Sequence, residues 1–181
     1  MTSNFTFQTD LLSLRVVREP QLAVAQTRYN ASTGEALVRL PAQFDDASLA
    51  HRQWLYSVVV ELMRTLAKRL LVPRLATFAA QYGLTYRRVF VKDMTSRWGS
   101  CSDRGNINLN LWLLLLPSPY VDYVLKHELC HLRELNHSAA FWQLLDTMTG
   151  GPGTARALSK AKNQYIQQQL APLLREIWSA R

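Results

Sequence analysis

Three of the four histidines in this chain lie within eleven consecutive positions, and their spacing restricts the local structure around them. His127 and His131 are four residues apart, and His137 follows shortly after the second. Residues four apart lie on one face of an α-helix, so a helix would direct the first two imidazoles to the same side. His137 can reach that side only if the chain reverses soon afterwards. The spacing therefore predicts a helix followed by a tight reversal.

Three imidazoles that meet at one point form a ligand set for zinc. Three protein ligands leave one tetrahedral position open for water, which is typical of a catalytic rather than a structural zinc ion. We therefore predict one Zn2+ per chain, bound by His127, His131 and His137. Histidine sites also bind other divalent first-row metals, so another divalent ion is an alternative.

Glu128 follows the first histidine and completes an HExxH motif. On a helix it projects about 100° away from His127, so it would flank the metal without binding it. In that position it could take a proton from zinc-bound water and return it to the leaving group. The motif thus predicts a zinc-dependent hydrolase in which Glu128 is the catalytic acid/base.

The first half of the sequence contains strand patterns followed by one long helical pattern. Helical apolar spacing begins after Asp45, the expected N-cap, and we expect a kink or break at Pro73. Gly83 is the expected C-terminal cap. Before this helix, alternating or β-branched segments predict antiparallel strands, the last two forming a hairpin, over residues 12–17, 22–29 and 35–40.

The second half predicts further strands and the helix that carries the histidines. Strands are expected over residues 88–93 and 106–110, at the edge of a sheet. Ser118 is the expected N-cap of the histidine helix, which should end near Asn136. Ser138 should cap the next helix. That helix should end at a glycine-rich cluster over residues 150–153.

Length and composition indicate one globular domain. A chain of 181 residues with 48% hydrophobic and 19% charged residues can bury a sizeable core. Within one domain we expect N-terminal strands, a long kinked helix, the sheet edge with the metal site, and C-terminal helices, over residues 1–44, 45–82, 86–149 and 154–181 respectively.

The net charge of +8 favours anionic partners, but the basic residues are dispersed along the chain. A solvated basic surface is therefore expected more than a dedicated nucleic-acid patch. Cys101 and Cys130 lack the count and spacing of a disulfide framework, and Cys130 should be a small buried hydrophobe. No secretory signal or bilayer-spanning run is visible, so we expect a cytoplasmic protein without membrane partners. Composition leaves the oligomeric state open.

Two segments resemble the YgjP-like metal-dependent hydrolases, relatives of the SprT and WLM zincins: RWGSCSDRGNINLN (Arg97 to Asn110) and DYVLKHELCHLRELNHSAAFW (Asp122 to Trp142). The resemblance implies an α+β fold of the small zincin kind, with an antiparallel-edged sheet over the HExxH helix and a long helix in the N-terminal half. It also implies a cleft between the HExxH helix and the edge strand. The three histidines match the family's zinc ligands, and Glu128 matches its catalytic residue.

The resemblance places the RWGSC motif beside this cleft. The candidate substrate contacts are Arg97, Trp98, Ser100 and Asn108. The Arg97 guanidinium could pair with a carboxylate or phosphate of the substrate. It could equally form a structural ion pair with Asp122 or Glu134. Aromatic residues such as Trp98 are expected in the core or the cleft wall, because they chiefly supply buried area.

These residues leave three functions open. The first is a metallopeptidase, in which an extended peptide pairs with the edge strand and Glu128 activates water. The second is a hydrolase of nucleotide phosphoanhydrides or another small anionic substrate, which suits the positive charge and Arg97. The third is a nucleic-acid-associated protease, which we rank last because no separate DNA-binding module is visible.

Overall fold

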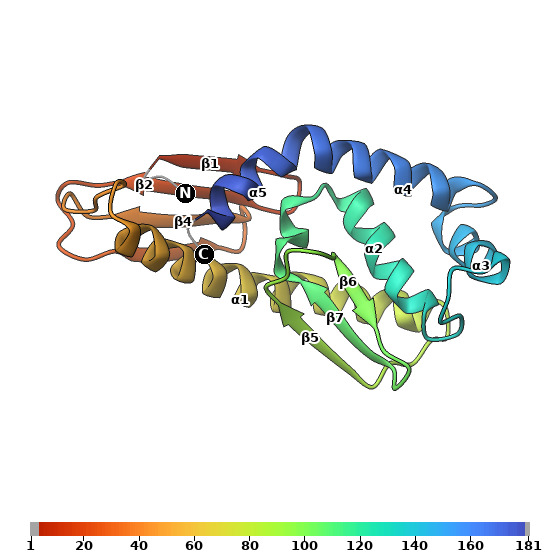
Figure 1. Ribbon diagram of the computed structural model, residues 1–181. Coiled ribbons are helices and arrows are strands. Elements are labelled where there is room, and N and C mark those ends of the chain that lie inside the picture. The colour runs from red at the N-terminus through yellow and green to blue at the C-terminus, as the bar shows by residue number, and fades with distance from the viewer. Residues whose placement is uncertain (1–3, 180–181) are drawn as a thin grey trace. The chain divides into compact units, whose positions relative to one another are not determined.

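The computed structural model describes residues 4–179 of the chain (Figure 1). Its contacts divide the chain into two compact units. One contains the residues up to Leu62 and those from Ile166 onward, and the other contains Met63–Tyr165. The long helix α1, Leu49–Gln81, contributes residues to both units. The single domain expected from the chain length stays a prediction.

The first unit contains a four-stranded sheet in the order β1-β2-β4-β3. β4 lies inside the sheet, and every second residue of this strand is buried, which is the pattern of a half-buried strand. The predicted hairpin is confirmed, because β3 and β4 pair in antiparallel register. The strand bounds are Phe5–Gln8 for β1, Ser13–Arg18 for β2, Gln26–Asn30 for β3 and Glu35–Leu40 for β4.

The pairing of β2 differs from the antiparallel arrangement expected from the sequence. β2 pairs in parallel with β4, and its antiparallel partner is β1, a strand that the sequence pattern did not predict. The short hairpin pairs β3 with one edge of β4, which leaves the other edge of β4 for β2. β3 itself remains largely exposed. The predicted strand over residues 22–29 begins only at Gln26.

Helix α1 begins later than expected and passes through its proline. Asp45 accepts a bond from the Ala47 amide at 2.9 Å and so caps the preceding turn, while the first residue of α1 is Leu49. Of the kink or break expected at Pro73, a break is excluded, because one helix continues to Gln81. Apolar residues on both sides of the proline, Leu71 and Leu75, are fully buried, and tertiary packing of this kind can outweigh a local propensity.

The C-terminal end of α1 was predicted correctly. Gly83 has φ +60°, the left-handed conformation of a helix-terminating glycine, and its amide donates to the Ala80 carbonyl at 3.3 Å.

The second unit contains a three-stranded sheet in the order β5-β7-β6. β5 (Arg88–Lys92) and β7 (Asn106–Asn110) confirm the two predicted strands, and β6 (Gly99–Cys101) lies within the RWGSC motif. β7 is central, parallel to β5 and antiparallel to β6. β6 is therefore an antiparallel edge strand, and it lies against helix α2.

The buried side chain of Asn110 holds the segment that leads into β6. Its Nδ2 donates to the carbonyls of Met94 and Arg97, both at 2.8 Å. Its Oδ1 accepts from the Trp112 amide at 3.2 Å, and its own amide donates to the Trp98 carbonyl at 3.0 Å. These bonds fix the course of the chain from Met94 to Trp98.

The remaining helices confirm the α+β class. They are the 3-10 helix η1 (Leu111–Leu115), α2 (Ser118–Cys130), α3 (Ala139–Thr149) and α4 (Thr154–Tyr165) in the second unit, and the π-helix η2 (Ile166–Leu170) with α5 (Ala171–Trp178) in the first. None of the helices within residues 4–179 has an apolar stretch of the length that a bilayer crossing requires.

The ends of α2 differ from the expectation. Ser118 is its first helical residue, and the N-cap is Pro117, which makes no side-chain bond. α2 ends at Cys130 instead of near Asn136, because the carbonyls of Leu129 and Cys130 accept the tighter bonds of a turn. The Ser138 cap of α3 is confirmed, since its Oγ accepts from the Phe141 amide at 3.2 Å.

Candidate metal centre

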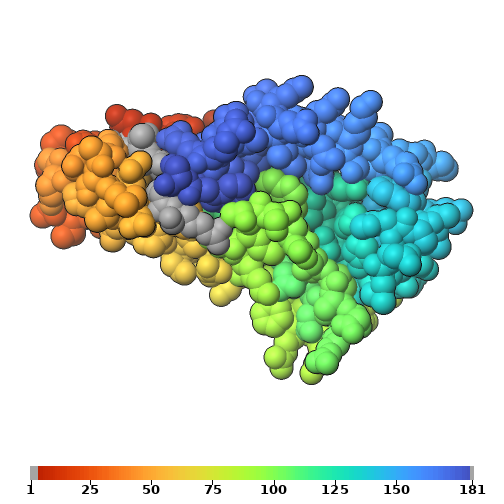
Figure 2. Space-filling view, in the orientation of Figure 1, coloured from red at the N-terminus to blue at the C-terminus, as the bar shows by residue number. Residues whose placement is uncertain are grey.

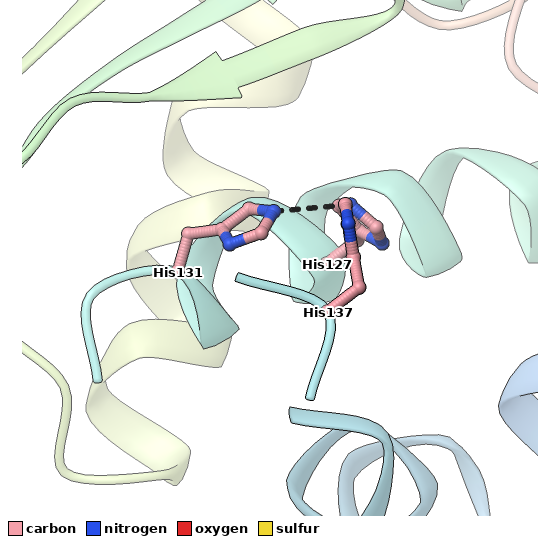
Figure 3. A group of neighbouring side chains, drawn as sticks. All are labelled: His127, His131 and His137. Carbon is pink, nitrogen blue, oxygen red and sulfur yellow. Dashed lines mark hydrogen bonds between the residues drawn. The ribbon is translucent and has the colours of Figure 1, made fainter. Parts of the chain in front are cut away.

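Three imidazole rings converge at the end of α2 (Figure 3). His127 lies in the last turn of α2, His131 caps the helix with φ −65° and ψ −11°, and His137 lies in the loop before α3. The Nε2 atom of His127 is 3.3 Å from that of His131 and 3.1 Å from that of His137. Because the C-cap residue keeps helical angles, the first two rings stay on one face although α2 ends between them.

Two of these rings are prepared to offer a lone pair from Nε2. The Nδ1 of His131 lies 2.9 Å from the Glu134 carbonyl, and a proton on Nδ1 would leave Nε2 unprotonated. Burial lowers the pKa of His127 to about 3, with the neighbouring histidines and Lys162 adding to the effect. His127 is therefore neutral at pH 7, which is the form that binds a metal.

Phe141, on α3, packs against all three imidazoles. Its ring centroid lies 4.9 Å from that of His127 and 4.7 Å from those of His131 and His137. Phe141 itself is fully buried. This ring therefore limits the rotation of the histidines and helps to hold their nitrogens together, which confirms the expectation that the aromatic residues here are structural.

Among the described residues, Glu128 is the one acidic or basic residue that is buried, with 5% of its surface exposed. A Cβ atom on Gly99 would lie only 2.6 Å from Glu128 Oε1, so the carboxylate lies directly against the backbone of β6. Its Oε2 is buried and has no hydrogen-bond partner among the described residues. The carboxylate is thus fixed on one side and free to exchange a proton on the other.

Burial and the neighbouring positive charges act on the pKa of Glu128 in opposite directions. Burial raises the pKa of Glu128 to about 8, and the positive charges of Lys162 and Arg97 oppose this shift. A cation held by the adjacent histidines would also oppose the upward shift and lower the pKa of Glu128, because a positive charge favours the carboxylate form.

His127, His137 and Glu128 line a cavity of about 440 Å³. This size lies within the range of small-molecule and substrate pockets. Three parts of the chain form its walls: the segment that leads into β6, helix α2 with the loop that carries His137, and helices α3 and α4. Helices α3 and α4 pack against each other, and Figure 2 shows their surfaces side by side. The lining residues are Trp98, Gly99, Tyr123, Val124, His127, Glu128, His137, Trp142, Ser159 and Lys162.

The four predicted substrate contacts do not all reach this cavity. Trp98 lines it, whereas the Asn108 amide donates to Ser100 Oγ at 3.0 Å across the strand pair, so these two side chains satisfy each other. Arg97 is exposed and acts on Glu128 through its charge. Its proposed ion pair with Asp122 is absent from the structure described, because Asp122 pairs with Arg74 instead.

The two cysteines lie outside the cavity lining. Cys130 is fully buried with its Sγ 3.4 Å from Met148 Sδ, as expected for a small apolar residue. Burial raises the pKa of the Cys101 thiol to about 11, which disfavours the nucleophilic thiolate.

Among the residues of the pocket wall that were not identified from the sequence as part of the site, Tyr123, Ser159 and Lys162 carry polar groups. Tyr123 lies one turn before His127 on α2, so helical spacing could have indicated it. Ser159 and Lys162 come from α4, and no motif connects them to the histidines. Only the tertiary structure brings them to the site.

The geometry fits a metal ion. One ring nitrogen from each of the three histidines lies within 4.8 Å of the other two. The contact of His131 Nδ1 with the Glu134 carbonyl orients the His131 ring, and the Glu128 carboxylate lies beside the cluster. An α+β fold with such a histidine cluster and a buried carboxylate is the architecture of a small zincin-like, metal-dependent hydrolase.

The comparisons with known proteins assign the family. The model of the YgjP-like metallopeptidase domain matches residues 18–162, and the chain belongs to this family. Among solved structures, the chain is similar to the metallopeptidase zymogen of Pyrococcus abyssi abylysin, with 24% identity and a TM-score of 0.45 over 51% of this chain and 91% of that one. No curated protein matches the chain significantly.

Proposed function

We propose that this protein is a zinc-dependent metallopeptidase, with His127, His131 and His137 as the metal ligands and Glu128 as the catalytic acid/base. The observation that carries the proposal is the convergence of three imidazole nitrogens beside a buried carboxylate, next to a cavity that His127, His137 and Glu128 line. When bound, the ion would supply Lewis acidity to a water molecule and to the substrate carbonyl.

Glu128 would move the proton in this reaction. Its unpartnered Oε2 could accept a proton from the attacking water and deliver it to the departing amine. The contact with Gly99 keeps the carboxylate from rotating away, so that the proton acceptor has one defined position.

The edge strand β6 would position the substrate. Within the sheet, β6 pairs only with β7, so its other edge can accept backbone hydrogen bonds from an extended peptide. Because β6 lies against α2, a peptide bound to that edge would pass beside Glu128. Edge pairing reads the backbone, so any sequence preference has to come from side chains that line the cavity.

The test uses the purified protein loaded with zinc, incubated with an unfolded protein or with a panel of nucleoside triphosphates. We expect peptide fragments from the unfolded protein, and about 100-fold or greater loss of that activity in Glu128→Gln, because a general base contributes about 10²–10⁴-fold. Bound metal, measured by mass spectrometry, should be retained in Glu128→Gln and lost in His137→Ala.

Other outcomes favour other functions. Release of pyrophosphate without peptide fragments would support the hydrolase of small anionic substrates, which the charges of Lys162 and Arg97 near Glu128 would suit. If neither reaction occurs and metal removal unfolds the protein, the ion has a structural role instead.

A further inference from the structure

Helix α4 presents a lysine to the cavity on the face that packs against its neighbours. Ala155, Ser159 and Lys162 are spaced at i, i+4 and i+7, so they share one face of the helix. Ala155 is fully buried, and the other two line the cavity. Long charged side chains normally occupy the solvent face of such a helix, so Lys162 stands where packing alone would favour an apolar residue.

The position of α4 is defined by the turn before it. Gly150, Gly151 and Gly153 have φ of 118°, 126° and 81°, a conformation in which other residues are strained, and they reverse the chain after α3. The Asp146 carboxylate then accepts the amides of Gly153 at 2.9 Å and Ala155 at 2.8 Å. These contacts hold the start of α4 in place, and α4 packs along α2 and α3.

The ammonium of Lys162 lies close to the reacting groups. Its Nζ is 5.3 Å from the centroid of the Tyr123 ring, and its charge acts on both Glu128 and His127. Among residues 4–179, Lys162 forms no ion pair with a carboxylate. A half-buried ammonium that no carboxylate contacts at ion-pair distance can gain from an anionic group brought by a ligand.

We propose that Lys162 binds a carboxylate of the substrate, and so gives the enzyme a preference for peptides with a negative charge beside the bond that is cut. The choice of a carboxylate over other anions rests on the proposed peptidase function. The carboxylate can be the C-terminus of the peptide or an acidic side chain next to the scissile bond. Because His127, His137, Glu128 and Lys162 line one cavity, this charge must lie close to the reacting carbonyl.

Binding can be measured without turnover, by calorimetry on metal-loaded Glu128→Gln protein. The probes are N-acetyl-glycyl-phenylalanine and its C-terminal amide, followed by an amidated peptide that carries Glu or Gln beside the glycine. We expect the free acid to bind about tenfold more tightly than the amide, which corresponds to about 1.4 kcal/mol, because a hydrogen bond between two charged groups is stronger than one to a neutral group. A preference for Glu over Gln, without one for the free C-terminus, would identify the acidic side chain as the source.

The variants isolate the charge of Lys162. Lys162→Met keeps the length of the side chain and should abolish the preference for the acid, whereas Lys162→Arg should retain it. Lys160→Met is the matched control, since Lys160 is exposed on the same helix and lies outside the cavity lining. Lys162→Gln replaces Lys162→Met if the latter unfolds, as judged by circular dichroism.

The inference and the proposed function fail separately. If Lys162→Met binds the acid and the amide with the wild-type ratio, Lys162 does not recognise the carboxylate, whether or not peptides are cleaved. If pyrophosphate binds more tightly than the peptide acid, in a manner that depends on Lys162, the choice of a carboxylate is overturned. If the preference holds but wild-type protein cleaves no peptide, only the peptidase proposal is lost.

Discussion

The two sheets of this protein are held by different kinds of interaction. In the four-stranded sheet, buried apolar side chains alternate along β4, and β2 beside it contributes further fully buried residues. In the three-stranded sheet, β6 has only three residues, and its position depends on the bonds of Asn110 and on the contact of Gly99 with Glu128. Apolar packing distributes its free energy over many contacts, whereas a polar site depends on single atoms. Substitutions should therefore affect mainly stability in the first sheet and mainly activity in the second.

The largest expected effect is on stability, in the first sheet. Leu14 on β2 is fully buried, and Leu14→Ala should lower the free energy of unfolding by about 2–5 kcal/mol through lost burial and the cavity left behind. The metal content and the kcat/KM of the folded protein should not change. Urea denaturation measures the free energy of unfolding. The control is Val24→Ala, at a residue with 67% exposure, which should change this free energy by less than about 0.5 kcal/mol. Equal losses in both variants would contradict the role of burial.

The next effect is on activity, in the second sheet. Gly99→Ala places a Cβ 2.6 Å from Glu128 Oε1, so the carboxylate must move. A shift of this size should lower kcat/KM about 100-fold while the histidines still bind metal. Peptide cleavage assays and metal analysis measure the two quantities. Ser100→Ala, on the same strand, should have a much smaller effect, and near wild-type activity in Gly99→Ala would show that the contact does not position Glu128.

Asn110 tests how far the second sheet depends on one polar side chain. Asn110→Ala removes the donor to two carbonyls and the acceptor of one amide, which should cost about 1–3 kcal/mol in the free energy of unfolding. Activity should fall as well, because the segment before β6 is released. Asn108→Ala, which removes one partly buried bond, should cost less. If the two variants behave alike, Asn110 is not the residue that fixes this segment.

The last comparison separates the two sheets by their response to pH. The raised pKa of Glu128, about 8, means that metal-free folded protein retains a proton that the unfolded chain releases near pH 4.5. Its free energy of unfolding should therefore fall as pH rises through this window, by at most about 1.4 kcal/mol per pH unit. The slope should be absent in Glu128→Gln and smaller with zinc bound. In the first sheet, the hydrogen bond from Arg39 lowers the pKa of Glu19. This pair therefore stabilises the folded state above pH 4.5, and the stabilisation is lost as the pH falls and Glu19 takes up a proton.

Much of the candidate site could be predicted because its residues are close in sequence. His127 and Glu128 lie in the last turn of α2 and His131 is its C-cap, and the Ser138 cap starts the next helix immediately after His137. Helical geometry and a cap are local interactions, and a sequence pattern records them directly. The end of α2 was predicted too late, yet the site was still found, because the helical angles of His131 preserve the direction of its ring.

The sequence by itself determined the histidine cluster, the neighbouring carboxylate, the β3–β4 hairpin and the mixed α+β class. Only the tertiary structure decided that β2 runs parallel to β4, that Gly99 lies against Glu128 and that Lys162 faces the same cavity. The physical reason is the range of the interactions. Local spacing repeats with the period of a helix or strand, whereas a contact between distant segments depends on how whole elements pack and leaves no period in the chain.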